Sequence, residues 1–260
     1  REVVDDLAGE HEALAAMLAT LQDSEWSLAT ASPGWTVADQ VGHLAYFDET
    51  AALAITDPSA FKAASEEMFA TLGDDGPDVL LAKSRAMTPR ELQRWWTQAS
   101  DSLVSTATGL DDAARVPWYG PEMGSKSFLS ARLMETWAHG QDIADATGRS
   151  RIPSMRLRHI AHLGVNTRGW AYAIRELPVD QSEIHVSLVA PDGSDWTWGP
   201  EHAESSIRGD AVDFCLVVTQ RRHVDDTHLR LEGSPAEEWM SIAQAFAGGP
   251  TDGPPPRSSL

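Results

Sequence analysis

The stretch GWTVADQVGHL, residues 34–44, contains a helix start and a candidate functional histidine. Pro33 and Gly34 are turn residues, and Thr36 followed three residues later by Asp39 matches a capping box. The apolar residues after Thr36 recur at helical spacing. We therefore predict a helix that begins after Thr36 and carries His43 shortly after its cap. Asp39 could alternatively orient His43, but the capping role is the preferred interpretation.

Outward from this stretch, the first part of the chain has the pattern of a helical bundle. Apolar positions at helical spacing predict three further long helices, over residues 4–21, 88–110 and 126–147. Residues 58–86 form a looser helical stretch that is broken by Gly73, Gly76 and Pro77. Four long helices with short connections are typical of a four-helix bundle, which we assign to residues 1–152.

In the remainder of the chain, the spacing of apolar residues changes from a helical to a strand-like period. A helix is expected over residues 154–177, and Ile184, Val186 and Leu188 then alternate with other residues as in a strand. Further strands are predicted at 196–198, 205–208 and 228–232, with helices at 211–219 and 235–247. The fold class is thus α+β with two domains, the second comprising a linking helix and a small α+β domain over residues 153–248. The tail, residues 249–260, is rich in Pro, Gly and Ser and is expected to be disordered or loosely attached.

Composition excludes several function classes. The 260 residues include 20 Lys and Arg against 39 Asp and Glu, a net charge of −19, which argues against binding nucleic acid or anionic lipid. A single cysteine, Cys215, excludes a disulfide framework and a cysteine-rich zinc site. No apolar run reaches membrane-spanning length, and residues 1–6 are charged with no signal-type apolar core after them. We expect a cytoplasmic protein, whose oligomeric state the sequence does not indicate.

Glu135 and His139 are the strongest candidates for chemistry. At positions i and i+4 of a helix they project from one face, where a carboxylate oxygen and an imidazole nitrogen can share a divalent ion at roughly 2.0–2.2 Å. A third ligand must come from another helix, and His43 is the best candidate. The alternatives are a solvated surface pair and a core histidine. Apolar neighbours disfavour the first: Leu133, Met134, Trp137 and Ala138.

These residues carry a resemblance to a known family. The run from Gly34 to His43, with Glu135-x-x-x-His139-x-x-Asp142 on a later helix, resembles the DinB superfamily of metal-binding four-helix bundles. It is most similar to the mycothiol-dependent maleylpyruvate isomerases, in which the bundle precedes a sterol-carrier-like α+β domain. The resemblance extends to about Gly248 and indicates an actinobacterial-type subgroup rather than the isomerase itself.

The resemblance implies roles for particular residues. His43, Glu135 and His139 match the three protein ligands of a divalent metal, with zinc expected and nickel as the other candidate. An arginine of the C-terminal domain serves the isomerase site, and Arg221 and Arg222 both stand at the matching place. Their alternative role is favourable interaction with a helix C-terminus.

Other polar residues have two interpretations each. Asp142 could bind substrate or support a ligand, or be an ordinary surface carboxylate. His11 lies on an apolar stripe and is interpreted as a satisfied core histidine, with a ligand role as the alternative. Cys215 is interpreted as a small buried hydrophobe. The residues Trp35, Tyr119 and Trp196 could line a pocket, whereas His159 and His162 lack supporting context.

The resulting hypothesis is an enzyme in which a low-molecular-weight thiol such as mycothiol ionises at the metal and attacks a small electrophilic substrate. Isomerisation or S-transfer would follow, with Arg221, Arg222 and Asp142 as catalytic candidates. Two alternatives remain: a hydrolase that uses water bound at the metal, and a small-molecule or lipid-binding module with a structural metal.

Overall fold

The computed structural model describes residues 2–72 and 78–257. It divides into two compact units, Arg1–Arg151 and Ile152–Leu260. The protein combines helices with small sheets, which confirms the predicted mixed class. None of the described helices has the length and apolar character needed to cross a membrane.

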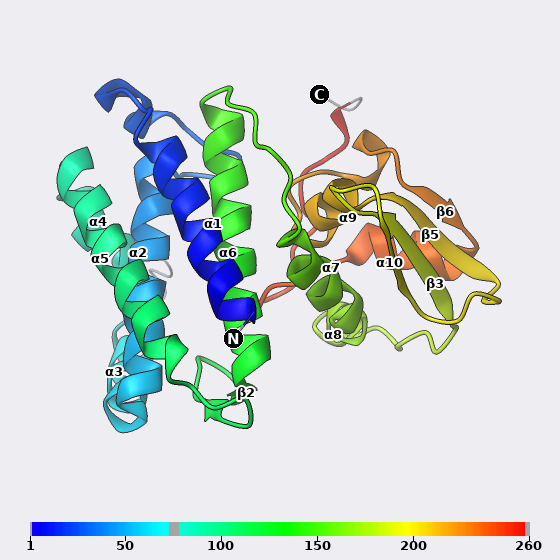
Figure 1. Cartoon of the computed structure of the whole chain (residues 1–260), viewed down its shortest axis with the longest axis horizontal. Helices are drawn as coiled ribbons and strands as arrows, with labels where there is room; N and C mark the ends of the chain where they lie inside the picture. The colour runs from blue at the N-terminus through cyan, green and yellow to red at the C-terminus, as the bar shows by residue number, and fades with distance from the viewer. Residues whose placement is uncertain (1, 73–77, 258–260) are drawn as a thin grey trace. The chain divides into compact units, whose positions relative to one another are not determined.

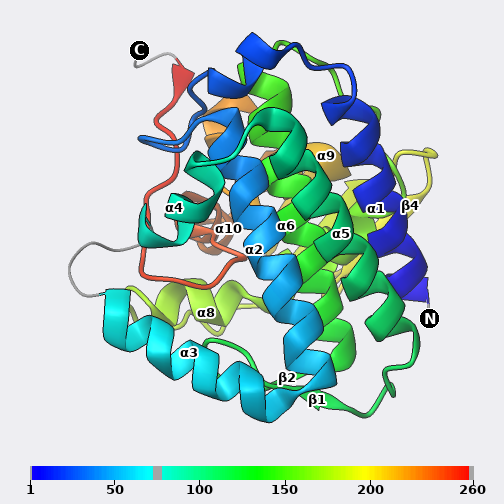
Figure 2. The same cartoon turned by 90° about the vertical axis from the view of Figure 1, so that its left-hand side faces the viewer.

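The first unit is almost entirely helical. Its four long helices lie side by side in both views (Figures 1 and 2): α1 packs on α5 and α6, and α2 packs on the same two helices. The elements of this unit are α1 (Glu2–Leu18), the 3₁₀ helix η1 (Asp23–Ser27), α2 (Val37–Thr56), α3 (Pro58–Leu72), α4 (Asp78–Arg85), α5 (Pro89–Thr108), β1 (Arg115–Val116), β2 (Met123–Gly124) and α6 (Ser125–Ala146).

The helix starts follow from local sequence. Helix α2 begins with the capping box that the sequence predicts, Thr36 with Asp39. Helix α5 begins with a second capping box that was not predicted, Thr88 with Glu91. The predicted breakers Gly73, Gly76 and Pro77 lie outside the described residues. The short β1–β2 pair is antiparallel and was not predicted, because two-residue strands have no readable period.

The main apolar cluster of the first unit lies between α1, α2, α5 and α6. Burial of these side chains is the main stabilising contribution to the bundle. The cluster consists of Leu14, Leu18, Trp26, Val37, Val41, Leu44, Ala45, Leu92, Trp96 and Ile143.

The second unit is built on a four-stranded sheet in the order β4-β3-β5-β6. Strand β3 is antiparallel to β4 and parallel to β5, and β5 is antiparallel to β6. Helix α9 packs on β3 and β5, and it also contacts α7. The elements are α7 (Leu157–Asn166), α8 (Arg168–Ala173), β3 (Ile184–Val189), β4 (Asp195–Trp198), β5 (Ser205–Asp210), α9 (Ala211–Val218), the 3₁₀ helix η3 (Val224–Asp226), β6 (Arg230–Glu232) and α10 (Ser234–Ile242).

Two helix predictions in this unit were wrong in extent. The single helix expected over 154–177 is two helices, α7 and α8, which meet at Thr167. The Thr167 hydroxyl donates to the carbonyls of Leu163 and Gly164, and this back-bonding favours a break in the helix. The helix expected to reach residue 247 ends at Ile242, because Ala243 has an extended backbone.

The tail was predicted to be loose, and this was wrong for residues 249–257. Thr251 donates its hydroxyl proton to Gln220 at 2.6 Å, and Gln220 donates back to the Thr251 carbonyl at 2.8 Å. The backbone N–H of Arg257 donates to the carboxylate of Asp226. Composition indicated the absence of a hydrophobic core in this segment, but it did not reveal these polar anchors.

Close packing between α7 and α9 makes Gly164 sensitive to substitution. A Cβ atom at Gly164 would lie 2.8 Å from a Val218 methyl and 3.1 Å from the Phe214 ring. We expect Gly164→Ala to lower the free energy of unfolding by about 1–3 kcal/mol, as overpacking does. Urea unfolding would measure this, with Gly169→Ala as the control, since a Cβ at Gly169 meets nothing within 4 Å. Equal stability of the two variants would contradict the packing argument.

Candidate metal centre

The position of His43 follows from the start of α2. Thr36 Oγ1 accepts a hydrogen bond from the backbone N–H of Asp39, and the Asp39 carboxylate accepts one from the backbone N–H of Thr36 at 2.9 Å. The other carboxylate oxygen of Asp39 accepts from Arg85 Nε at 2.9 Å. Both oxygens of Asp39 are therefore engaged at the helix start, which supports the capping role over an interaction with His43.

His43, Glu135 and His139 converge at one point between α2 and α6. One donor atom from each residue lies within 4.8 Å of the other two. The Oε2 atom of Glu135 is 3.1 Å from His139 Nε2 and 3.5 Å from His43 Nε2. Two imidazoles and a carboxylate match the donor set of a catalytic divalent-metal site. The residues present therefore fit a metal ion by number, type and convergence.

The electrostatics of this cluster keep Glu135 ionised. Burial by itself would raise the pKa of Glu135, but hydrogen bonds with His139 and His43 outweigh it and hold the pKa well below its usual range. The side chains of His43 and Glu135 remain 21% and 23% exposed. The cluster thus offers an anionic oxygen on a side that solvent reaches.

The second ring nitrogen of His139 is also occupied. His139 Nδ1 makes a short contact with Gln40 Oε1, and Asp142 Oδ2 lies 3.7 Å from the same nitrogen. Gln40, His139 and Asp142 are all buried. Asp142 is therefore not the ordinary surface carboxylate that the sequence allowed as one interpretation.

Three polar contacts follow each other along the α2–α6 seam. Gln40 contacts His139, His43 contacts Glu135, and Asp48 contacts Arg132. Residue numbers rise along α2 as they fall along α6, so the two helices run antiparallel here. The candidate ligands His43 and Glu135 form the middle contact. The Gln40–His139 and Asp48–Arg132 contacts lie on either side of it, and we call each of them a brace.

The Asp48–Arg132 brace is deeply buried. Arg132 Nη2 donates to Asp48 Oδ1 at 2.8 Å, with both side chains at 4% exposure or less. The guanidinium of Arg132 also lies about 6 Å from the centres of the Phe47 and Trp118 rings. Sequence analysis missed Gln40, Asp48 and Arg132. Spacing could have indicated two of them. Gln40 and Arg132 each precede a candidate ligand, His43 and Glu135 respectively, by three residues, which places each pair on one helix face.

His11 lies in the core but is not a satisfied histidine. Its Nε2 is 3.5 Å from Asp48 Oδ2, and neither ring nitrogen makes a hydrogen bond to a described residue. Burial lowers the pKa of His11, and the nearby Arg132 acts in the same direction, whereas Asp48 opposes them. His11 is not part of the convergent cluster. Arg132 bonds the other carboxylate oxygen, Asp48 Oδ1, so the oxygen that faces His11 also makes no hydrogen bond to a described residue.

Aromatic rings border the cluster. The Trp35 ring stacks on His139 with a centroid distance of 6.1 Å and an interplanar angle of 17°. His43 is 4.5 Å from Phe47, whose ring contacts Tyr119 at 5.5 Å. Of the three residues expected as pocket candidates, Trp35 and Tyr119 thus lie on or near the cluster. Trp196 lies in β4 of the second unit, where it is buried.

The remaining candidates lie in the second unit. Arg221 and Arg222 follow α9, and the backbone N–H groups of both donate to the carbonyl of Leu216. Their guanidinium groups donate to nearby carbonyls, those of Thr219 and Arg221. Such contacts agree with an interaction at a helix C-terminus. Cys215 is fully buried, and burial raises the pKa of its thiol, which excludes it as a nucleophile near neutral pH.

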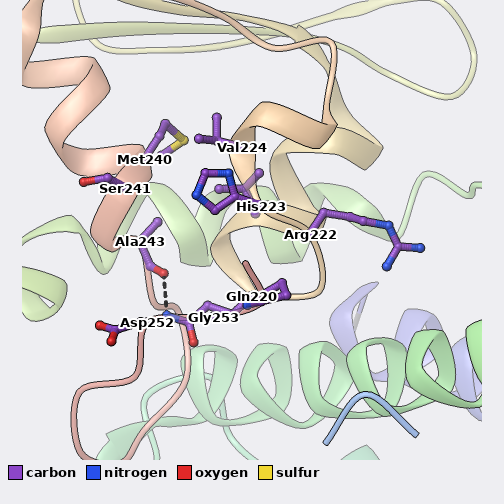
Figure 3. Close-up of a pocket in the computed structure, with 11 residues that line it drawn as sticks. Gln220, Arg222, His223, Val224, Met240, Ser241, Ala243, Asp252 and Gly253 are labelled. Carbon is purple, nitrogen blue, oxygen red and sulfur yellow. Dashed lines mark hydrogen bonds between the residues drawn. The ribbon is translucent and has the colours of Figure 1, made fainter. Parts of the chain in front are cut away.

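A small pocket of about 20 Å³ lies beside Arg222. Figure 3 shows the Arg222 guanidinium directed away from Met240 and Ser241, which lie across the pocket. The volume is enough for about one water molecule. This pocket therefore gives no support to the binding of a lipid chain.

The site residues of the first unit lie within a stretch that matches a known family. Residues 7–144 match the family described as the mycothiol maleylpyruvate isomerase N-terminal domain. The chain belongs to this family. The matched stretch includes the whole α2–α6 seam, and the family resemblance drawn from the sequence motifs is confirmed.

Relatives of this family member extend the match beyond the bundle. Uncharacterized proteins of Mycobacterium tuberculosis, from the strains CDC 1551 and H37Rv, are 40% identical over 252 residues, 96% of this chain and 97% of theirs. Two crystal structures of the mycothiol-dependent maleylpyruvate isomerase, one of a point mutant, align over 90% of this chain and 94% of theirs. The TM-score is 0.59 at 14–15% identity, which shows a shared fold.

Proposed function

We propose that this chain is a divalent-metal-dependent enzyme that uses a low-molecular-weight thiol of the mycothiol type on a small electrophilic substrate. The reaction is either isomerisation or S-transfer, in which the sulfur of the thiol becomes bonded to a substrate carbon. The observation that carries the proposal is the convergence of His43, Glu135 and His139 in a chain of the mycothiol maleylpyruvate isomerase N-terminal family. Zinc is the expected metal, with nickel as the other candidate, because imidazole ligands suit both.

Three protein ligands leave a coordination position for an exogenous group, as in catalytic sites. A divalent ion held by these ligands would supply one effect, the ionisation of a coordinating thiol near neutral pH. The chain contributes the anionic oxygen of Glu135, which the neighbouring imidazoles keep ionised. The Trp35 ring stacks on one face of the His139 ring.

The substrate chemistry follows from the nucleophile. A thiolate that adds to a conjugated double bond leaves a single bond, which rotates before the thiolate is expelled. No atom is gained or lost, and the product is the other geometric isomer. If the substrate instead carries a leaving group, the thiolate forms a C–S bond as the bond to the leaving group breaks, and that group departs with the electron pair. The thiol then remains bonded to carbon, which is S-transfer.

We assign supporting roles to three further residues. Arg221 or Arg222 holds a carboxylate of the substrate or of the thiol, a bidentate task that suits a guanidinium group. Asp142 supports His139, whose Nδ1 it faces at 3.7 Å. The two arginines are alternatives, and substitution decides between them.

Thiol binding tests the proposal directly. In protein loaded with Co²⁺, mycothiol should produce a sulfur-to-metal charge-transfer band in the near ultraviolet, and S-methylated mycothiol should not. Turnover of a maleylpyruvate-type substrate should require the thiol. It should fall about 100-fold or more in one of Arg221→Ala and Arg222→Ala, since that variant loses a charge-assisted bidentate contact.

Other outcomes would contradict the proposal. Turnover without any added thiol would favour metal-dependent hydrolysis. Activity that survives in both arginine variants would remove the arginine assignment. Copurified lipid, together with binding unchanged in His139→Ala, would favour the binding-module alternative.

A further inference from the structure

We infer that Gln40 is a positioning residue that accepts a hydrogen bond from His139 Nδ1 and so makes Nε2, the nitrogen beside Glu135 and His43, the atom that would coordinate a metal ion. The inference rests on the metal site of the proposed function. It concerns a residue that contacts a candidate ligand and none of the reacting groups.

Gln40 occupies a fully enclosed place in the first turn of α2. Its side chain has no exposed surface, so each polar atom of its amide requires a protein partner. The amide nitrogen lies 2.8 Å from Thr30 Oγ1 and 3.0 Å from Ser32 Oγ, and the amide oxygen contacts His139 Nδ1. The amide thus joins the loop before α2 to a ring on α6.

The hydrogen bonds of Thr30 determine which way this amide points. The single hydroxyl proton of Thr30 is donated to the Trp35 carbonyl at 3.1 Å. Thr30 Oγ1 can therefore only accept from Gln40, and the atom that faces it must be the donor Nε2. The remaining amide atom, the acceptor Oε1, then faces His139.

Two acceptors consequently surround one nitrogen of His139. Gln40 Oε1 contacts Nδ1, and a carboxylate oxygen of Asp142 lies 3.7 Å away. Because the amide oxygen of Gln40 can only accept, Nδ1 carries the proton. Nε2, which contacts Glu135 Oε2 at 3.1 Å, is then the nitrogen that would give its lone pair to a metal ion. A residue that hydrogen-bonds the second ring nitrogen of a metal-binding histidine fixes its tautomer, and loss of that residue typically weakens metal binding.

The same loop also reaches His139 through an aromatic contact. Trp35 stacks on His139, and its backbone N–H donates to the Ser32 carbonyl at 3.0 Å. The backbone N–H of Thr30 donates to the Trp35 carbonyl at 2.9 Å. Trp35 in this loop and Gln40, whose amide is bonded to the loop, therefore orient one ring, Gln40 by its nitrogen and Trp35 by its face.

Substitution of Gln40 separates this role from simple packing. Gln40→Met keeps the approximate volume but removes the acceptor, and Gln40→Glu keeps an acceptor for the Nδ1 proton. We expect the affinity for Zn²⁺, measured by competition with a chromophoric chelator, to fall about 10–100-fold in Gln40→Met. Gln40→Glu keeps the acceptor at Nδ1 but loses the amide donor to Thr30 and Ser32, so its affinity should lie between those of Gln40→Met and the wild type. The visible spectrum of the Co²⁺ form should change in Gln40→Met and be retained in Gln40→Glu.

Gln98→Met, an exposed position on α5, is the matched control and should bind Zn²⁺ as the wild type does. Circular dichroism verifies the folding of each variant. Wild-type affinity in Gln40→Met, or equal losses in folded Gln40→Met and Gln40→Glu, would overturn the positioning role while the metal site stands. Failure of the wild type itself to bind Zn²⁺ or Co²⁺ would overturn the proposed metal site and this inference with it.

Discussion

Replacement of His43, Glu135 or His139 by alanine is expected to abolish stoichiometric metal binding. Each residue contributes one of three convergent donors, and loss of an outer partner alone typically costs about 10–100-fold in affinity. Loss of a direct ligand should therefore exceed 100-fold. Mass spectrometry of untagged protein should find about one metal ion per wild-type chain and almost none in the variants.

The design of this experiment includes matched controls. His162→Ala removes an exposed histidine that bonds Trp198 and Asn166, and Glu12→Ala removes an exposed carboxylate of α1. Both should retain the wild-type metal content. Retention of metal in His43→Ala but not in Glu135→Ala would place the ion on α6 alone. A wild type that stays empty after incubation with zinc or nickel would contradict the metal centre.

Separation of the Asp48–Arg132 pair is expected to produce the largest loss of stability. Both side chains are almost fully buried and bonded at 2.8 Å, so Arg132→Met leaves a buried carboxylate without its cation. Breaking such a pair typically costs about 3–5 kcal/mol. Urea unfolding of the full chain should show this loss for Arg132→Met and for Asp48→Asn. The exposed control Asp101→Asn should change stability by less than about 0.5 kcal/mol.

The neighbouring His11 adds a pH dependence to this result. In the wild type, burial lowers the pKa of His11. The charge of Arg132 lowers it further, whereas Asp48 raises it. Removal of Arg132 leaves Asp48 as the nearest charge, which favours protonated His11. A group whose native pKa rises adds stability below that pKa and loses it as the pH increases. The loss in free energy of unfolding caused by Arg132→Met should thus be smaller near about pH 5.5 than near about pH 8.

The double variant Asp48→Leu/Arg132→Met gives the complementary test. With both charges replaced by apolar groups of similar size, no buried charge is left unpaired, and stability should recover towards that of the wild type. Additive losses in the double variant would contradict the view that the unpaired charge causes the destabilisation. Metal content measured on the same proteins would show whether this brace also holds α2 and α6 at the spacing that the ligands need.

Local patterns were enough to place the individual helices. Thr36 with Asp39 marks the start of α2 because a capping box involves groups only three residues apart. Glu135 and His139 are on one face of α6 for the same reason, since the helix repeat determines their separation. The helix break at Thr167 was missed, because a hydroxyl that bonds back to its own helix leaves the apolar period unchanged.

The sequence by itself therefore determined the four long helices, the order of helical and sheet segments and the three candidate donor residues. Tertiary structure alone decided what surrounds those donors. Gln40 and His139 are 99 residues apart, and Asp48 and Arg132 are 84 apart. No short-range pattern encodes these pairings, because they exist only after α2 and α6 pack in antiparallel register. The tautomer of His139 and the charge balance around His11 depend on that packing and not on any local motif.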